Sequence, residues 1–290
     1  MTDTVIFPAK FQKKYTLSCG GRLIDLSSPA VMGILNLTPD SFFDGGKFTE
    51  ENIIISHVEQ MVLHGALIID LGAASSRPGS ALISEEEEVK RLLPMLRVLR
   101  KKFSETIFSV DTWRSEIARK AVDEGADIIN DISGGEMDKK MFETVAALKI
   151  PYILMHLKGT PQTMQQEPTY ENVVTEVLKS LQSKVRLLHD MGVNDIIVDP
   201  GFGFGKTVDH NYQLLAHLEL FHQLNCPLLA GFSRKSMINK LLNISAKEAL
   251  NGTTILNTIA LQKGVHLLRV HDVKEASECI RICDKMNSAN

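Results

Sequence analysis

Short apolar runs, many of them rich in β-branched residues, recur along this 290-residue chain, and amphipathic stretches separate most of them. Runs of this kind are typical of strands that are buried on both faces of a parallel sheet. Eight of them fit strands, at residues 31–35, 66–69, 106–110, 126–129, 152–155, 195–198, 227–230 and 265–268. Eight strands alternating with helices, in a chain slightly longer than the roughly 250 residues of a usual barrel, predict a (β/α)8 (TIM) barrel. An open, doubly wound sheet is the main alternative.

A different pattern precedes the first of these runs. Two short apolar stretches flank Gly20-Gly21 within residues 15–26, which predicts a β-hairpin with a primed turn. The hairpin is too small to form a domain, and no low-complexity linker or internal repeat divides the chain. We therefore expect a single domain over residues 1–290, with the hairpin at about 15–26 and the barrel at about 30–286. Further along, Ser84 and Glu87 have the spacing of a capping box, which predicts the start of a helix.

Polar side chains follow every one of the eight predicted strands. Barrel enzymes build their active sites from the C-terminal strand ends and the loops that follow them. A single Asp after a strand is usually a turn or helix cap, but eight polar strand ends are hard to explain by capping alone. We therefore expect these side chains to converge on one ligand cavity. They are Asn36; Asp70 with Ser75, Ser76 and Arg77; Asp111; Asn130 and Asp131; His156; Asp199; Ser233 to Ser236; and Arg269 with His271.

The side chains at these strand ends suit two ligand chemistries. Those suited to phosphate or pyrophosphate are Asn36, Arg77, Lys235, Arg269 and His271. Those suited to a flat heterocycle are Asp111, Asn130 and Asp199. A carboxylate accepts two parallel hydrogen bonds from a 2-amino-N–H edge, and an Asn side chain pairs with a mixed edge. The alternative for Arg269 is to lay its planar guanidinium on the ring of the heterocycle.

Other functions lack their usual signatures in this sequence. There is no Ser–His–Asp or Cys–His pattern in a recognisable context, and the four scattered cysteines predict buried free thiols instead of a zinc site. Residues 201–207 look like a nucleotide-binding P-loop, but Pro200 stands where that motif requires glycine. We expect these glycines to let the backbone bend closely around a ligand, or to form a merely flexible loop.

Charge and hydropathy narrow the range of partners and locations. A net charge of −3 gives no reason to expect binding to nucleic acid or to an anionic membrane. The chain has no signal-peptide core and no apolar run long enough to span a bilayer. We therefore expect a cytoplasmic protein with small-molecule substrates.

Several of the polar segments together resemble the dihydropteroate synthase family of pterin-binding enzymes. Residues 32–46, Met-Gly-Ile-Leu-Asn-Leu-Thr-Pro-Asp-Ser-Phe-Phe-Asp-Gly-Gly, are similar to the first family signature, and residues 75–79, Ser-Ser-Arg-Pro-Gly, to the second. Six more matching segments follow in family order, at residues 109–112, 130–135, 155–161, 199–206, 233–236 and 269–272. The resemblance spans nearly the whole chain, and the first, sixth and eighth segments together are highly specific.

This resemblance implies a (β/α)8 homodimer of an enzyme class that sulfonamides target. The implied reaction condenses 6-hydroxymethyl-7,8-dihydropterin pyrophosphate with 4-aminobenzoate in folate biosynthesis. The implied pterin-binding residues are Asp111, Asn130, Asp199, Lys235 and Arg269. The implied pyrophosphate-binding residues are Asn36, Arg77, Arg269 and His271, with Asn36 also meeting Mg²⁺, the implied cofactor. The implied 4-aminobenzoate pocket comprises Phe42, Ser76, Pro78, Phe204, Lys235 and Ser236, and the implied catalytic residues are Asp111, Arg77, Lys235 and His271.

The second signature departs from the common family form. Relatives commonly read Gly-Gly-Glu-Ser-Thr-Arg-Pro-Gly there, whereas residues 72–79 of this chain read Gly-Ala-Ala-Ser-Ser-Arg-Pro-Gly. A non-catalytic pterin-binding paralogue is therefore one alternative, although intact Asn36, Arg77 and Lys235 count against it. A methyltetrahydrofolate:corrinoid methyltransferase is a second alternative, which shares the barrel but does not need residues 36–41 and 75–77.

The implied reaction favours an SN1-like path. The dihydropterin can delocalise a methylene cation, and pyrophosphate leaves readily once its developing charge is offset. Asp111 is expected to stabilise that cation. An aromatic amine needs no strong base, so His156 is interpreted as structural and Trp113 as a packing residue. The loops at residues 39–46 and 72–79 have few apolar anchors, and we expect them to order only around bound ligand.

Overall fold

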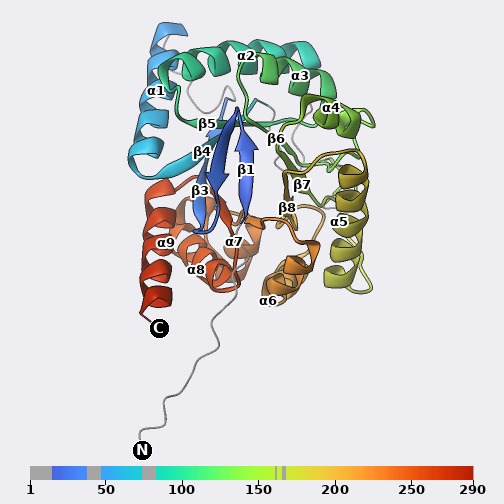
Figure 1. Cartoon of the computed structure of the whole chain (residues 1–290). Helices are drawn as coiled ribbons and strands as arrows, with labels where there is room; N and C mark the ends of the chain where they lie inside the picture. The colour runs from blue at the N-terminus through green and yellow to red at the C-terminus, as the bar shows by residue number, and fades with distance from the viewer. Residues whose placement is uncertain (1–14, 38–46, 74–82, 161, 165–167, 290) are drawn as a thin grey trace, which may run out of the picture.

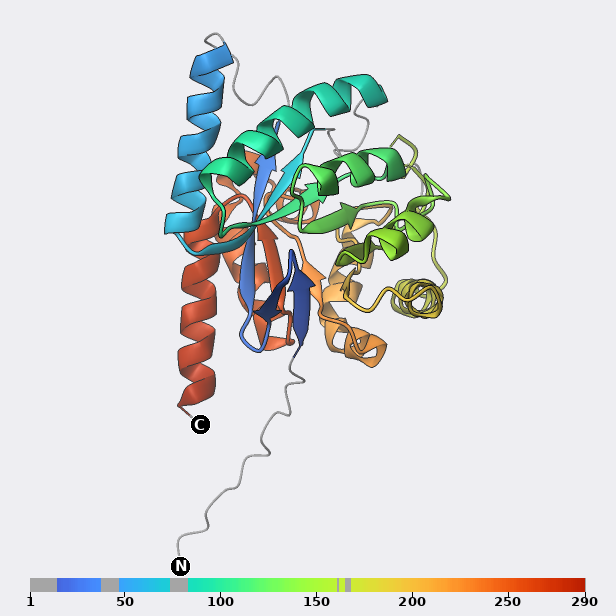
Figure 2. The same ribbon diagram turned by 45° about the horizontal axis from the view of Figure 1, so that its top comes forward.

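The computed structural model describes the chain apart from residues 1–14, 38–46, 74–82, 161, 165–167 and 290. Its main sheet has eight parallel strands in the order β8-β7-β6-β5-β4-β3-β10-β9. The two outer strands meet at a parallel bridge between Val198 and Leu228, where the Val198 amide donates to the Pro227 carbonyl at 2.9 Å. Figures 1 and 2 show the strands at the centre with the helices around them. The predicted barrel is therefore confirmed, and the open-sheet alternative is wrong.

All eight predicted strands are present, with small shifts at their ends. They are β3 (Ala30–Asn36), β4 (Ala66–Gly72), β5 (Ile107–Asp111), β6 (Ile128–Asp131), β7 (Tyr152–Met155), β8 (Ile196–Asp199), β9 (Leu229–Ala230) and β10 (Leu267–Val270). The described α-helices are α1 (Lys47–Leu63), α2 (Glu85–Lys102), α3 (Ser115–Asp123), α4 (Met141–Leu148), α5 (Val173–Asp190), α6 (Val208–Ala216), α7 (Ser236–Leu242), α8 (Leu250–Gln262) and α9 (Val273–Ser288). Two 3-10 helices, η2 (Leu218–Leu224) and η3 (Ala246–Glu248), complete the described helices.

The start of α2 agrees with half of the predicted capping box. The Ser84 hydroxyl accepts a hydrogen bond from the Glu87 amide at 3.2 Å, so Ser84 is the N-cap. The Glu87 carboxylate binds Arg91 one turn further on, with Nε 2.7 Å from Oε1. The glutamate therefore supports the first turn of the helix through an i,i+4 ion pair.

The predicted hairpin is confirmed and closes one end of the barrel. Strands β1 (Thr16–Cys19) and β2 (Arg22–Asp25) pair antiparallel, and Gly20 and Gly21 have φ values of +54° and +79°. Positive φ at both turn residues is the geometry of a type I′ turn, which glycine adopts without a steric cost. Figure 1 shows the hairpin in front of the barrel strands.

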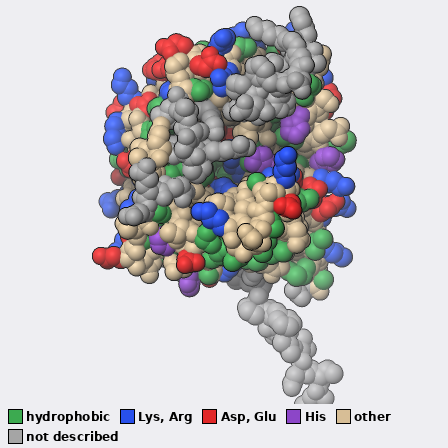
Figure 3. Space-filling model, turned by 180° about the vertical axis from the view of Figure 1, so that it is seen from behind, with side chains coloured by type: hydrophobic (Ala, Val, Ile, Leu, Met, Phe, Trp, Pro, Cys, Tyr) green, Lys and Arg blue, Asp and Glu red, His purple; other side chains and the backbone are tan. Residues whose placement is uncertain are grey.

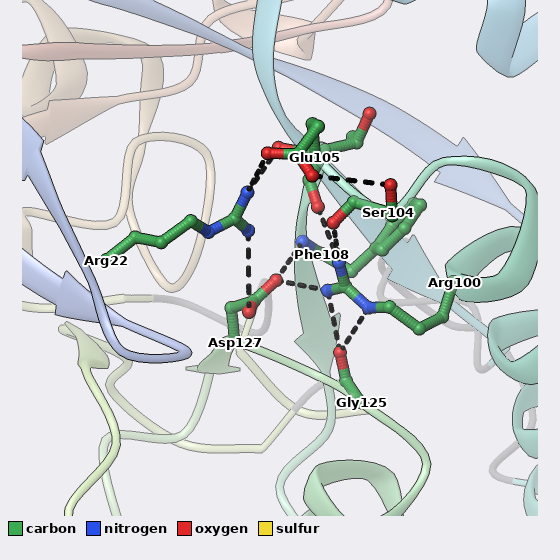
Figure 4. A network of polar contacts seen from close by, with 8 residues as sticks. Arg22, Arg100, Ser104, Glu105, Phe108, Gly125 and Asp127 are labelled. Carbon is green, nitrogen blue, oxygen red and sulfur yellow. Dashed lines mark hydrogen bonds and ion pairs between the residues drawn. The ribbon is translucent and has the colours of Figure 1, made fainter.

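A polar network binds the hairpin to the loops that precede β5 and β6 (Figure 4). Arg22 donates to the Glu105 carbonyl at 2.8 Å, and its other terminal nitrogen lies 4.0 Å from the Asp127 carboxylate. Asp127 in turn accepts from the Phe108 amide at 2.9 Å and binds Arg100. The hairpin is thus held to the barrel by charged groups at its turn as well as by apolar side chains.

The inside of the barrel changes from apolar to polar along its axis. The layer nearest the strand starts takes one apolar residue from each strand and packs against Leu17, Cys19 and Leu26 of the hairpin segment. This layer comprises Met32, Ile68, Ile107, Ile128, Ile153, Ile197, Leu229 and Leu267. Because strand side chains alternate, residues two positions further along also face inward. They are Ile34, Asp70, Ser109, Asn130, Met155, Asp199, Gly231 and Arg269. The polar part of the interior therefore lies toward the C-terminal strand ends.

The outer surface carries charges of both signs. On the face shown in Figure 3, basic and acidic side chains are interspersed, as the net charge of −3 suggests. Within the residues that the structure describes, no helix combines the length and the apolar character needed to cross a membrane.

Candidate active site

Arg269 on β10 reaches two carboxylates that come from neighbouring strands. Its Nε lies 2.7 Å from Oδ2 of Asp70, and its Nη2 lies 3.0 Å from Oδ2 of Asp111. Asn130 donates to the same Asp70 oxygen at 3.0 Å. Asp70 is completely buried, and the Asp111 side chain is 10% exposed. One guanidinium therefore links β4, β5 and β10 at the polar end of the barrel. The side-chain amide of Asn130 on β6 binds the same Asp70 carboxylate.

The electrostatics of this cluster favour an electron-poor ligand. Burial raises the pKa of Asp111, and the neighbouring Asp70 raises it further, whereas the Arg269 guanidinium opposes both effects. Burial on its own lowers the pKa of Arg269, but the two carboxylates outweigh it and raise that pKa. Once Asp111 is ionised, two carboxylates beside one guanidinium leave an excess of negative charge, which suits a ligand that develops positive charge.

A third acid and a half-buried lysine form the opposite part of the site. The Asp199 carboxylate at the end of β8 accepts from the Gly201 amide at 2.7 Å. Burial raises the pKa of Asp199, and the ammonium of Lys235 opposes the shift. Lys235 donates to the Phe202 carbonyl, and its Nζ lies 4.7 Å from the centre of the Phe204 ring. Burial lowers the pKa of Lys235 to about 8.

The remaining described site residues lie at neighbouring strand ends. Asn36 ends β3 and pairs in register with Gly72 of β4. The His271 amide donates to the Ser233 hydroxyl at 3.2 Å, and Nδ1 of the same histidine lies 3.1 Å from that oxygen. Ser236 is exposed and is the first residue of α7.

Two polar residues from the strand ends do not join the cluster. Asp131 lies beside Asn130 in the sequence, but it accepts from the Tyr152 hydroxyl and the Ser133 amide, both at 2.7 Å. Arg234 binds the Asp272 carboxylate, with Nη2 2.6 Å from Oδ1. The prediction that all these side chains converge is wrong for Asp131, because successive side chains on a strand point to opposite faces. Asp131 therefore stabilises the turn after β6 from the helix side.

His156 and Trp113 have the structural surroundings that the sequence suggested. Burial lowers the pKa of His156 to about 2, and its Nδ1 lies 3.1 Å from Nζ of Lys206. Burial also lowers the pKa of Lys206 to about 7. Trp113 packs with Phe204 against an apolar cluster, and the Arg114 guanidinium carbon lies 4.1 Å from its ring centre. That cluster comprises Ile132, Met155, Leu157 and Met164.

Two residues with important contacts here were given no ligand or catalytic role by the sequence, although Asp70 was expected among the strand-end side chains of the cavity. Asp70 organises Arg269 and Asn130, and the signals for it were its place near a strand end and its charge within the otherwise apolar segment Ala66–Gly72. Lys206 is 3% exposed, although a lysine in a glycine-rich loop is usually solvated. No sequence pattern distinguishes a buried lysine from an exposed one, because burial depends on how the loop folds.

Part of the predicted site falls outside the described residues. Ala73 is buried and described, whereas the next nine residues are not. The predicted site residues outside the described ranges are Phe42, Ser75, Ser76, Arg77 and Pro78. The predicted closure of the loops at 39–46 and 72–79 therefore stays a prediction.

Other possible sites in the described residues have weaker chemistry. No group of three or more His, Cys, Asp or Glu side chains there is arranged to hold a metal ion. The four cysteines are buried and free, which confirms the expected thiols. A cavity of about 470 Å³ involves Ala30, Gly65 and Lys274, at the N-terminal ends of β3 and β4 and along α9. It lies at the opposite end of the barrel from the polar cluster, where barrel enzymes do not place their chemistry.

Comparison with known proteins identifies the family. The family model described as "Pterin binding enzyme" matches residues 32–271. The chain is 44% identical to the dihydropteroate synthase of Escherichia coli K12 over 271 residues, which cover 93% of this chain and 95% of that protein. It is 42% identical to the dihydropteroate synthase of Haemophilus influenzae over 268 residues, which cover 92% and 97% of the two chains.

Solved structures agree with the sequence relatives. Yersinia pestis dihydropteroate synthase, solved in complex with a sulfonamide drug, has a TM-score of 0.88 and 40% identity, and the match covers 94% of this chain and 100% of that one. Xanthomonas albilineans dihydropteroate synthase, solved with 7,8-dihydropteroate, has a TM-score of 0.84 and 34% identity, and the match covers 94% and 99%. With sequence and fold in agreement over nearly the full length of both partners, this chain belongs to the dihydropteroate synthases within the pterin-binding enzyme family.

Proposed function

We propose that this chain condenses 6-hydroxymethyl-7,8-dihydropterin pyrophosphate with 4-aminobenzoate, which yields 7,8-dihydropteroate and pyrophosphate in folate biosynthesis. The observation that carries the proposal is the cluster of Asp70, Asp111, Asn130 and Arg269 at the C-terminal end of the barrel. Members of the same family from Xanthomonas albilineans have been solved with 4-aminobenzoic acid and with 7,8-dihydropteroate. The pterin ring of dihydropteroate is a flat heterocycle of the kind that Asp111, Asn130 and Asp199 of this chain suit, and the carboxylate of 4-aminobenzoic acid is an anion that the cationic side chains of the site suit.

The pterin is proposed to bind between the two acidic parts of the site. Asp199 is 6% exposed and is placed to accept from adjacent ring N–H groups, while Asn130 pairs with a mixed donor and acceptor edge. Lys235 lies beside Asp199, and Arg269 presents a planar guanidinium for stacking on the ring. Asp111 completes this set, and its negative charge would stabilise a positive charge that develops on the pterin.

The pyrophosphate is proposed to lie toward Asn36 and His271. Arg77 and Arg269 are its proposed cationic partners. The Asn36 amide oxygen is a hard ligand of the kind that Mg²⁺ accepts. Mg²⁺ commonly binds through few protein groups and takes its other ligands from phosphate and water, so a single strand-end amide fits it. When bound, Mg²⁺ would offset negative charge on the pyrophosphate oxygens. We therefore propose Mg²⁺ as the cofactor.

The 4-aminobenzoate is proposed to bind at the α7 end of the site. Phe204 offers an aromatic face next to the Lys235 ammonium, and Ser236 lies at the exposed start of α7. A ring of the substrate can pack on Phe204, while its carboxylate meets Ser236 and the nearby helix amides. Phe42, Ser76 and Pro78 are proposed to complete this pocket.

The proposed reaction follows an SN1-like path. The bond between the exocyclic methylene and the pyrophosphate oxygen breaks first, and the electron pair leaves with pyrophosphate. The dihydropterin delocalises the remaining cation, which the Asp111 carboxylate stabilises. The amine nitrogen of 4-aminobenzoate then forms the new C–N bond and loses a proton to solvent. Because an aromatic amine is nucleophilic without prior deprotonation, this path needs no strong base in the site.

A single assay separates this function from its alternatives. Pyrophosphate release from the pterin substrate should be fast with 4-aminobenzoate and slow without it. A non-catalytic paralogue would bind the pterin without releasing pyrophosphate in either case. A methyltetrahydrofolate:corrinoid methyltransferase would instead transfer a methyl group from methyltetrahydrofolate. Neither alternative is favoured by the described site.

We also propose that the enzyme is a cytoplasmic homodimer. Support for the dimer comes from apolar side chains that α8 and α9 leave exposed, namely Ile255 at 50%, Ile282 at 69% and Met286 at 46%. Isologous burial of such a surface is the usual way for two copies of one chain to associate. Sedimentation equilibrium would test the mass, and a monomer at micromolar concentration would contradict the dimer.

A further inference from the structure

Lys206 is the last residue of the glycine-rich loop at residues 201–206, and the proposed chemistry does not use it. Its side chain is buried, and Nζ lies 2.9 Å from each of the Gly201 and Phe204 carbonyl oxygens. The same nitrogen lies 3.1 Å from Nδ1 of His156 at the end of β7. The His156 carbonyl oxygen is a fourth acceptor, at 3.4 Å, so acceptors outnumber the three N–H groups of an ammonium. Lys206 is therefore saturated by protein groups and links two positions of one loop to a neighbouring strand.

The loop that Lys206 holds reaches both substrate regions through its backbone. The Gly201 amide donates to the Asp199 carboxylate at 2.7 Å, and the Phe202 carbonyl accepts from Lys235. A Cβ atom at Gly203 would lie 2.9 Å from Cδ of Lys235, so the loop backbone also packs directly on the stem of that lysine. The conformation of the loop thus sets where an acid and a lysine of the site can lie.

The loop has little intrinsic preference for this conformation. Gly201, Gly203 and Gly205 have φ values of +73°, +81° and +58°. Glycine populates this left-handed region and several others about equally, so a segment with three such glycines loses much conformational entropy on ordering. Hydrogen bonds that cross the loop can offset this cost. The Lys206 ammonium supplies such bonds at Gly201 and at Phe204.

We propose that Lys206 is a positioning residue that cross-links the 201–206 loop and thereby aligns Asp199, Lys235 and Phe204 for the two substrates. This inference rests on the proposed function. Neutral His156 is its partner, because only an unprotonated Nδ1 can accept from the ammonium. Because its N–H groups are taken up by protein acceptors, the effect of Lys206 is on binding geometry and not on a chemical step.

Lys206→Met is the test variant, since it keeps most of the apolar stem and removes all three donors. The affinity for the pterin substrate, measured by calorimetry without 4-aminobenzoate, should fall about tenfold to a hundredfold, and the KM for 4-aminobenzoate should rise similarly. Lys240→Met, at an exposed lysine on α7, is the matched control and should leave both values unchanged. A folded Lys206→Met protein with a lower melting temperature but unaltered affinity and KM would overturn the proposal, because that pattern marks a merely structural lysine.

Variants of His156 test the same link from the other side and serve if Lys206→Met does not fold. His156→Gln retains an acceptor and should keep near-normal affinity for the pterin, whereas His156→Leu should weaken it. Equal affinities of the Gln and Leu variants would contradict the role of this bond. Measurements on the wild-type chain separate the proposed synthase function from the proposed role of Lys206. If it binds the pterin but releases no pyrophosphate, the proposed function fails, while the calorimetric comparison still decides the role of Lys206.

Discussion

Replacing Asp70 by Asn should destabilise the protein more than any exposed acid-to-amide change. Asp70 is completely buried and holds two nitrogens of Arg269, at 2.7 and 2.6 Å, as well as Asn130 at 3.0 Å. Breaking a buried ion pair by neutralising one partner costs about 3–5 kcal/mol. Arg269 keeps its bond to Asp111 and is 19% exposed, so the lower end applies. We expect a loss of about 3 kcal/mol in the free energy of unfolding.

This loss can be measured by denaturant unfolding, followed by the fluorescence of Trp113, the only tryptophan of the chain. A loss of this size corresponds to a fall of roughly 6–12 °C in melting temperature for a chain of this size. Asp123→Asn, at an exposed acid that ends α3, is the matched control and should leave the unfolding midpoint unchanged. The Asp70 variant should also bind the pterin more weakly, because Arg269 and Asn130 both lose the carboxylate that orients them. A loss below about 1 kcal/mol at neutral pH would refute the reasoning, since it would mean that Asp111 alone can hold Arg269.

Further predictions concern the ligands. Asp199→Ala should abolish pterin binding in calorimetry, since the buried N–H groups of the ring lose their acceptor; unchanged affinity would remove Asp199 from the site. Excess chelator should abolish turnover and leave the circular dichroism spectrum intact, whereas unfolding would indicate a structural metal. The kcat/KM should rise with pH as Asp111 ionises and fall above about pH 8 as Lys235 loses its proton; a flat profile would exclude both roles. In equilibrium dialysis, 4-aminobenzoate should bind weakly to the free enzyme and more tightly with pyrophosphate and Mg²⁺; equal affinity would mean a preformed pocket.

The sequence was sufficient for the architecture because the barrel rests on a repeated local pattern. Each strand is a short run of largely apolar residues, and the helices between them place their apolar faces on the outside of the sheet. The hairpin was equally predictable, since two adjacent glycines with positive φ between short strands leave few other geometries. Barrel topology then sends every C-terminal strand end to the same side, so the general place of the site follows from strand order alone.

Only the tertiary structure decided which polar side chains meet. Asn130 and Asp131 are neighbours in the sequence, yet one joins Asp70 inside the barrel and the other binds Tyr152 on the helix side. One residue of register separates these outcomes, and the apolar run before them does not fix that register by its composition. The central place of Asp70 likewise depends on Arg269, which lies 199 positions away along the chain.

The burial of Lys206 likewise could not be predicted from the sequence of its loop. Its neighbours Gly201 to Gly205 allow many backbone paths, and a lysine in such a segment would ordinarily extend into solvent. The ammonium is instead enclosed by carbonyl oxygens of its own loop and by a histidine from another strand. Local sequence determines which conformations a segment can adopt. Which of them is populated depends on hydrogen bonds and burial that exist only once distant strands are packed together.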